Sequence, residues 1–344
     1  MHLKRIICVG VVTLGVTATS GAASAFATTI NEAGSSLVFP LVSVWASHYT
    51  AATVQPHSTG SGKGIGAIQV GQADIGASDA PMTSSQYSGV KSGSVVQIPW
   101  ALSATGVGYN IPGVGYGLKV NAAILAGIFS GKITTWNNKA ILAINPSFKG
   151  ALSKAGKITP VVRSDGSGDS YAFQHYLSVA GGKAWTYSYG TTWGSPAGIG
   201  ENGNSGVAGE VRSNPGTIGY ISAYYLANER ITTAQVENAA GNFEVPNAPN
   251  IADAAASNST ISAQGPSFSG VSIVDPSKNY TTAYPISTYT YAIVNKDDSN
   301  LTAVKAFLSW VISPTGGLYD GDTLDFSPLP TGIRAADASL INSL

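Results

Sequence analysis

Residues 158–177, ITPVVRSDGSGDSYAFQHYL, form a unit of three successive patterns. Its β-branched start predicts a short strand, and its Gly/Ser-rich middle predicts a loop. The following residues predict a helix with Phe173, Tyr176 and Leu177 on one face. Two earlier stretches, residues 28–49 and 52–69, have the same outline of strand, Gly/Ser loop and helix. Alternating strands and helices indicate an α/β protein.

The rest of the chain gives weaker signals. Residues 73–81 predict a short strand and loop, residues 289–294 a strand, and residues 303–312 a helix. Residues 241–278 are rich in Ala, Ser, Asn and Pro, and they predict loop with broken helix. No internal repeat divides the chain.

The N-terminus has the pattern of a secretory signal peptide. A basic start is followed by a short apolar segment and small residues, so cleavage is expected after Ala25 or Ala27. The single cysteine, Cys8, lies inside this peptide. The mature chain is therefore expected to lack disulfides and thiolate metal sites, and to lie in the periplasm or be secreted.

Composition excludes some classes of function. Only 10% of residues are charged and the formal net charge is zero, which argues against a nucleic-acid binder that neutralises phosphate backbones. Beyond the signal peptide, His48, His57 and His175 are isolated and show no metal-ligand spacing. We therefore expect no metal and no cofactor.

The three Gly/Ser loops suggest an anion site. Each begins a helix, where free backbone N–H groups and a partial positive charge favour an anion. Arg163 offers a fork of donors to a tetrahedral oxyanion, and Asp165 is placed to hold its guanidinium. Helix capping and a surface ion pair are the simpler readings of the same residues.

Asp79 is informative because a carboxylate repels anions. It fits the site if the anion carries a proton that Asp79 accepts as a hydrogen bond. Such a site prefers protonated phosphate to sulfate, which has no proton to give at neutral pH. A simple turn residue before Pro81 is the alternative.

The sequence resembles the phosphate-binding proteins of high-affinity bacterial phosphate ABC transporters. The specific segments are DIGASDAP (residues 74–81) and RSDGSG (residues 163–168). Weaker ones are AGSSL (33–37), TGSG (59–62), NIPG (110–113), GKITTW (131–136), PGTIGY (215–220) and YPIS (284–287). Together they span nearly the whole mature chain in family order.

The resemblance implies a two-lobed periplasmic-binding-protein fold of type II. Each lobe would have a mixed sheet flanked by helices, with the ligand cleft at the hinge. The expected divisions are residues 1–27 for the signal peptide, 28–103 plus 288–344 for lobe I, and 104–287 for lobe II. The implied function is capture of inorganic phosphate and delivery to ABC permease subunits, by a monomer that is not an enzyme.

The resemblance also implies a set of phosphate ligands. Asp79 would accept the phosphate proton, and Asp165 would support Arg163. The full set of implied phosphate-binding residues is Ser36, Leu37 (through its N–H), Ser61, Asp79, Arg163, Ser167, Gly168 and Asp169.

Asp169 departs from the family, which usually has Thr at this position. Three readings stay open. Asp169 caps the helix and turns away, leaving only its N–H for phosphate; or it accepts a second proton from monobasic phosphate; or it alters ligand preference.

Other functions remain as alternatives. A secreted phosphatase would need a metal cluster or activated nucleophile, and neither is evident. A binder of sulfate, molybdate or a phosphonate is the third class. A calcium loop fails because Ser170 and Tyr176 stand where Gly and Glu are needed, and a nucleotide P-loop fails at Gly64.

Overall fold

The computed structural model describes residues 28–262 and 264–344. The expected signal peptide, its cleavage sites and Cys8 lie outside the described residues. Within the described part of the chain, no helix is both long and apolar enough to cross a membrane.

The fold is organised by one eight-stranded mixed sheet with the order β2-β1-β3-β11-β4-β8-β6-β7. Both ends of this order are parallel, while the central pairs that involve β11 and β4 are antiparallel. The strands are β1 (Thr29–Gly34), β2 (Thr53–Ser58), β3 (Ile75–Ser78), β4 (Val95–Asn110), β6 (Thr159–Arg163), β7 (Ile199–Glu201), β8 (Thr217–Ser222) and β11 (Ser287–Asn295).

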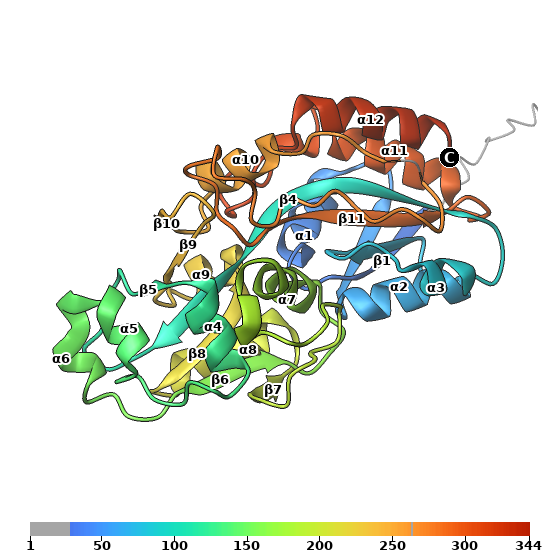
Figure 1. Cartoon of the computed structure of the whole chain (residues 1–344). Coiled ribbons are helices and arrows are strands. Elements are labelled where there is room, and N and C mark those ends of the chain that lie inside the picture. The colour runs from blue at the N-terminus through green and yellow to red at the C-terminus, as the bar shows by residue number, and fades with distance from the viewer. Residues whose placement is uncertain (1–27, 263) are drawn as a thin grey trace, which may run out of the picture.

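Strand β4 connects the two lobes. Its first part, to Ala104, pairs with β11, and from Thr105 onward it pairs with β8 instead. Fifteen of its 16 residues are buried, which means that both faces of the strand are covered. A strand covered on both faces does not need alternating apolar and polar residues, and β4 has no such alternation. Figure 1 shows β4 running from the region of β1 and β11 into the region of β8 and β6. The change of partner thus falls at residues 104–105, the boundary expected between the two lobes.

Helices cover both lobes. The helices in the residues expected to form lobe I are α1 (Phe39–His48), α2 (Ser61–Val70), α3 (Ser84–Ser88), α11 (Leu301–Val311) and α12 (Thr331–Asn342). Those in the residues expected to form lobe II include α4 (Ala122–Phe129), α5 (Lys139–Ile144), α6 (Lys149–Leu152), α7 (Gly168–Ala180), α8 (Gly203–Ser213) and α9 (Ala223–Asn228). A small sheet of β5 (Lys119–Val120), β9 (Gln235–Glu237) and β10 (Phe243–Glu244) completes lobe II.

The three strand–loop–helix units predicted from the sequence are confirmed as β1–α1, β2–α2 and β6–α7. Each helix buries the predicted apolar face. In α7 that face is Phe173, Tyr176 and Leu177, all at most 1% exposed. Trp136, expected in the core, is fully buried.

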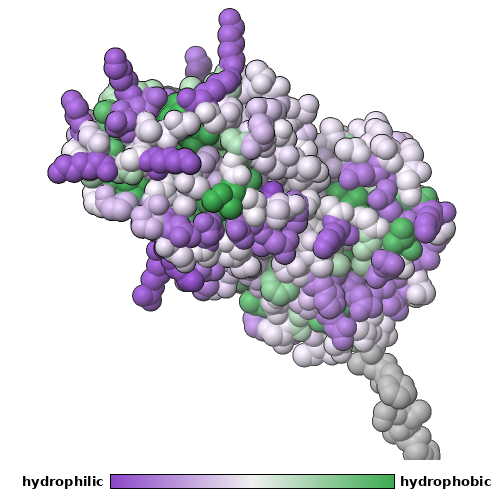
Figure 2. Space-filling view, turned by 90° about the horizontal axis from the view of Figure 1, so that it is seen from below, coloured by the Kyte–Doolittle hydropathy of each residue, from purple (hydrophilic) through white to green (hydrophobic). Residues whose placement is uncertain are grey.

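The predicted irregular region contains β10, α10 (Ala248–Ala256) and then a long loop to β11. This loop returns to lobe I, where Gln264 bonds Gln97 and the Tyr291 hydroxyl accepts a bond from the Val271 N–H. The apolar residues are thus largely internal, and the face shown in Figure 2 is mainly hydrophilic or intermediate with small separate hydrophobic patches.

Candidate functional site

Three loops meet between the lobes. Ser36 lies before α1, Ser61 at the start of α2, and Ser167 is the N-cap of α7. The three serines follow the carboxyl ends of strands β1, β2 and β6, which is where ligand sites of open α/β sheets usually lie. All three serines are at most 3% exposed.

Hydrogen bonds join the lobes directly at these loops. The Gly168 N–H donates to the Ser61 Oγ at 3.1 Å, and the Gly62 N–H donates to the Gly166 carbonyl at 2.9 Å. Such close approach requires glycine, since a Cβ on Gly168 would lie 2.3 Å from the Asp79 Oδ2. The loop starts of α2 and α7 therefore contact each other across the cleft.

Arg163 is the cation of the site. Its Nε and Nη2 donate to the two oxygens of Asp165 at 2.7 and 2.5 Å, so the expected support of Arg163 by Asp165 is present. Arg163 is 2% exposed, which excludes the reading of a surface ion pair. Burial alone would lower the pKa of Arg163, but Asp165 and Asp169 outweigh it and the pKa rises. Burial likewise works to raise the pKa of Asp165, but Arg163 holds it below the ordinary value.

Asp79 follows β3 and is 1% exposed. The Ser35 hydroxyl lies 2.6–2.7 Å from both carboxylate oxygens, and Thr290 donates to Oδ1 at 2.9 Å. Ser61 lies 3.3 Å from Oδ2. Burial, and next the charge of Asp169, raise the pKa of Asp79 to about 7. The burial of Asp79 and its hydrogen bonds argue against the alternative interpretation, that Asp79 is a simple turn residue before Pro81.

Asp169 lies inside the site and does not cap its helix. Ser167 provides the cap by accepting from the Ser170 N–H, so the helix-capping reading of Asp169 is wrong. The Asp169 carboxylate instead accepts from Arg163 Nη1 at 2.9 Å and from the Thr105 Oγ1 at 2.8 Å. Burial raises its pKa, while Arg163 opposes the rise.

The remaining candidate is Leu37. Leu37 is fully buried, and its backbone N–H donates to the Ser35 Oγ at 3.0 Å. The structure thus brings together the loops that hold all the candidate residues.

Sequence reasoning missed four polar residues of the site. Asn204, at the start of α8, donates from Nδ2 to Asp169 at 2.7 Å and to the Ser36 Oγ at 3.0 Å. The other three are Ser35, Thr105 and Thr290, which contact the two acids as described above. Asn204 stands in a Gly/Asn-rich stretch, ENGNSG (residues 201–206), which resembles the other helix starts and was the available signal.

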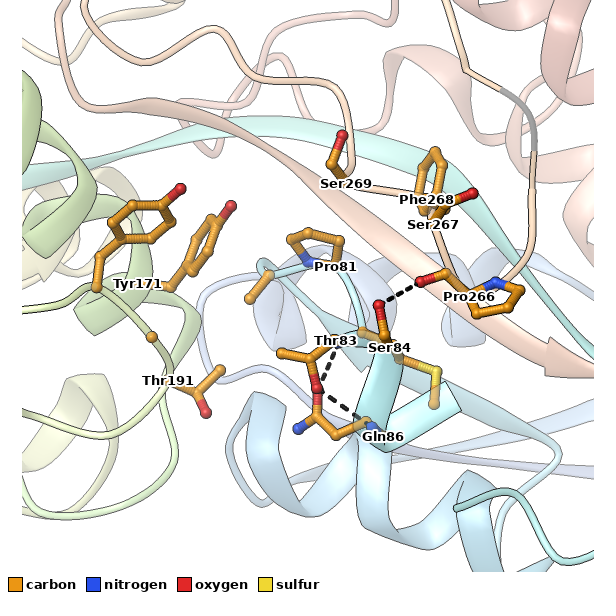
Figure 3. A pocket seen from close by; sticks show the side chains of 14 residues that line it. Pro81, Thr83, Ser84, Gln86, Tyr171, Thr191, Pro266, Ser267, Phe268 and Ser269 are labelled. Carbon is orange, nitrogen blue, oxygen red and sulfur yellow. Dashed lines mark hydrogen bonds between the residues drawn. The ribbon is translucent and has the colours of Figure 1, made fainter. Parts of the chain in front are cut away.

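A cavity opens at the edge of the cleft. It has a volume of ≈ 370 Å³ and is lined from both lobes and from the loop at residues 266–269. Figure 3 shows Tyr171 and Thr191 on one side and Pro81 and Thr83 on the other. Tyr171 belongs to α7, the helix that begins at Gly168 after its N-cap Ser167, so the cavity adjoins the site.

The histidines do not cluster. In the described residues, no three side chains of His, Cys, Asp or Glu are placed to hold a metal ion. His48 pairs with Asp320 at the surface, and His175 stacks on Tyr189 with ring centroids 4.4 Å apart.

Comparison with known proteins identifies relatives along most of the chain. Residues 18–315 match the family model of the PBP superfamily domain. The phosphate-binding protein PstS of Xylella fastidiosa (strain 9a5c) is 34% identical over 313 residues, which cover 88% of this chain and 82% of that protein. The protein of the same name from Pasteurella multocida is 33% identical over 88% of this chain and 87% of its own length.

Among solved structures, a putative phosphate ABC transporter substrate-binding protein from Clostridium perfringens, with bound phosphate, has the same fold. Its TM-score is 0.63 with 16% identity, and the match covers 88% of this chain and all of that one. This likeness supports the two-lobed architecture.

Proposed function

We propose that this chain, which belongs to the PBP superfamily and within it to the PstS phosphate-binding proteins, captures inorganic phosphate. The phosphate would be held between the lobes and delivered for import by an ABC transporter. The relatives are phosphate-binding proteins rather than enzymes, and function here is closure on an ion without a chemical step.

The observation that carries the proposal is the buried Arg163–Asp165 pair at the meeting point of three helix starts. Asp165 fixes the guanidinium through Nε and Nη2, Asp169 takes one N–H of Nη1, and each Nη nitrogen keeps a second N–H that suits a tetrahedral oxyanion. The donors around it come from both lobes, so an anion held there favours the closed form. The proposed ligands from the first two loops are Ser36, Leu37 and Ser61.

Selectivity is assigned to Asp79. Its carboxylate offers an acceptor for a phosphate hydroxyl, while sulfate at neutral pH brings only lone pairs to the same atoms. The proposed ligands of the third loop are Arg163, Ser167, Gly168 and Asp169.

The lobes are proposed to be residues 28–103 plus 288–344 and residues 104–287. The change of β4 pairing at residues 104–105 supports this division, although the loop around Gln264 lies against lobe I. We further propose a monomer, located in the periplasm or otherwise outside the cytoplasm, that docks on the permease subunits.

Titration calorimetry of the purified protein tests the proposal, using phosphate, arsenate and sulfate at acidic and neutral pH. Phosphate and arsenate are expected to bind and sulfate is not. Absence of phosphate binding at every pH refutes the function, and tight sulfate binding refutes the role of Asp79. Hydrolysis of a chromogenic phosphate ester would instead favour the phosphatase alternative.

A further inference from the structure

The site contains two buried carboxylates that come from opposite lobes. Asp79 follows β3 in lobe I, and Asp169 lies in the first turn of α7 in lobe II. Each is 1% exposed. We propose that Asp169 makes phosphate bind with one more proton than a single acidic acceptor requires, so that the preferred ligand is the dihydrogen monoanion. This inference rests on the proposed function and concerns the same site.

The two acids meet at the start of α7. Asp79 packs directly against Gly168, because a Cβ added to Gly168 would lie 2.3 Å from the Asp79 Oδ2. Gly168 directly precedes Asp169. The Ser61 hydroxyl contacts both Asp79 and the start of this helix, because it lies 3.3 Å from the Asp79 Oδ2 and 3.1 Å from the Gly168 nitrogen. An anion held by the N–H groups of this helix start therefore faces both carboxylates.

The charges do not balance in favour of a dianion. Among the described residues, Arg163 is the only Lys or Arg that bonds to these acids, and Asp165 already takes its Nε and Nη2. Asp169 contacts the remaining Nη1 at 2.9 Å, and Asp79 has only hydroxyl partners. One guanidinium thus faces three carboxylates before any ligand arrives, and each added negative charge is repelled in a low-dielectric interior.

Additional protons on the ligand or on the acids would reduce this excess of negative charge. Monohydrogen phosphate has one O–H group, which satisfies one acceptor and leaves the second carboxylate facing phosphate lone pairs. Dihydrogen phosphate has two O–H groups, one for each acid. A proton placed on Asp169 instead, facing the dianion, gives the same total, so the proposal concerns the number of protons in the complex.

The neighbouring titratable groups do not supply these protons. Burial raises the pKa of Tyr220 on β8 above its ordinary value and that of Tyr225 on α9 to about 12, so both stay neutral. His175 lines a small space beside Asp79, and burial lowers its pKa. The carboxylates respond in the required direction, because burial raises the pKa of Asp79 and of Asp169.

The opposing possibility is equally concrete. Asp169 receives hydrogen bonds from Arg163, Thr105 and Asn204, and all three favour its ionised form. If it stays ionised and takes no proton from the ligand, the site binds phosphate with the same proton count as a site with one acid.

Proton linkage distinguishes the two. Above the second ionisation of phosphate the free ligand carries one proton. A complex with two protons must then take one up, so affinity falls about tenfold per pH unit in this range. A complex with one proton takes none up, and its affinity is flat there.

The experiment is titration calorimetry with inorganic phosphate, from about pH 6 to about pH 9.5, in two buffers of different ionisation enthalpy at each pH. The wild type is compared with Asp169→Thr, which replaces the carboxylate by a hydroxyl, and with the isosteric Asp169→Asn. Far-UV circular dichroism and thermal unfolding check that the variants fold.

We expect the wild type to lose about tenfold in affinity per pH unit on the alkaline side, with uptake of about one proton. Asp169→Thr should show a flat alkaline profile without proton uptake. A flat wild-type profile overturns the inference, and so does a variant that keeps the wild-type slope. The wild-type profile decides the matter alone if neither variant folds. Absence of phosphate binding by wild type and Asp169→Thr at all pH values overturns the proposed function itself.

Discussion

Replacement of Arg163 by alanine is the most direct test of the site. The Arg163 side chain is 1% exposed, and its partners Asp165 and Asp169 are 7% and 1% exposed. Removing the guanidinium leaves both carboxylates buried without a cation. Truncation of one partner in a buried charged pair costs about 2–5 kcal/mol of binding free energy. This corresponds to a loss of about 30-fold to about 4,000-fold in phosphate affinity.

The same change also affects folding, because breaking a buried ion pair costs about 3–5 kcal/mol of stability. Affinity is therefore measured by calorimetry alongside thermal unfolding, with and without phosphate. Arg163→Lys separates charge from geometry. It keeps the positive charge but loses the fork that meets Asp165 at two atoms, so its affinity should fall between those of wild type and Arg163→Ala.

The matched control is Arg212→Ala. Arg212 pairs with Glu229 at 3.0 Å, but its side chain is 59% exposed, so the expected change in stability is at most about 1 kcal/mol and phosphate affinity should not change. If folded Arg163→Ala binds phosphate within about threefold of wild type, the guanidinium contributes less than about 1 kcal/mol, and the assignment of Arg163 as the anion's cation is refuted.

Single substitutions at Asp79, Gly168 and Asp337 test ligand selectivity, contact between the lobes and the pH dependence of stability. Asp79→Asn should narrow the preference for phosphate over sulfate in competition titrations, because the amide donates to an oxyanion that the carboxylate repels; an unchanged ratio would contradict the proposed selectivity. Gly168→Ala should weaken phosphate binding because its Cβ meets Asp79, whereas Gly66→Ala has open space and should bind normally; equal affinities would argue against close contact of the lobes in the bound form. Neither oxygen of buried Asp337 has a hydrogen-bond partner among the described residues, and burial raises its pKa to about 9. The folded state favours the protonated form of Asp337. The contribution of this group to stability should therefore be greatest below about pH 4 and should fall as the pH rises toward 9. Asp337→Asn should flatten that fall in thermal unfolding measured across this pH range.

The strand–loop–helix units were predictable because their signals are local. Residues 158–177 contain a β-branched run, a Gly/Ser loop and apolar residues at helical spacing, and the structure has β6 and α7 there. Arg163 and Asp165 are two residues apart, so their pairing also depends on local geometry. Such features need no knowledge of the rest of the chain.

Strand β4 was not predictable in the same way. It is buried along almost its whole length, and a continuous apolar run does not distinguish a strand from a buried helix. Its change of partner at residues 104–105 depends on β8 and β11, which lie more than 100 residues away in sequence. The hinge therefore follows from long-range pairing.

Asn204 shows the same limit inside the site. Asparagine is common at helix starts, and nothing in ENGNSG distinguishes a capping residue from a functional one. Its role follows from four contacts. Its Nδ2 reaches both Ser36 and Asp169, its N–H also reaches Ser36, and its Oδ1 accepts from the Ser222 N–H. The serine lies 168 residues away, in the other lobe.

These contacts give Asn204 a different task from the loop donors. Because one amide is bound to lobe II through Ser222 and Asp169 and to lobe I through Ser36, its bonds are complete only when the lobes are closed. An opening of the proposed cleft would separate Ser36 from Asn204 and would expose both acids to water, which would remove their desolvation cost. Closure therefore gains hydrogen bonds but must bury two carboxylates again, and the anion's protons are what make that burial favourable. If the proposed two-proton complex forms, phosphate recognition and lobe closure are one equilibrium, in which Asp79 and Asp169 oppose closure until a protonated ligand is present.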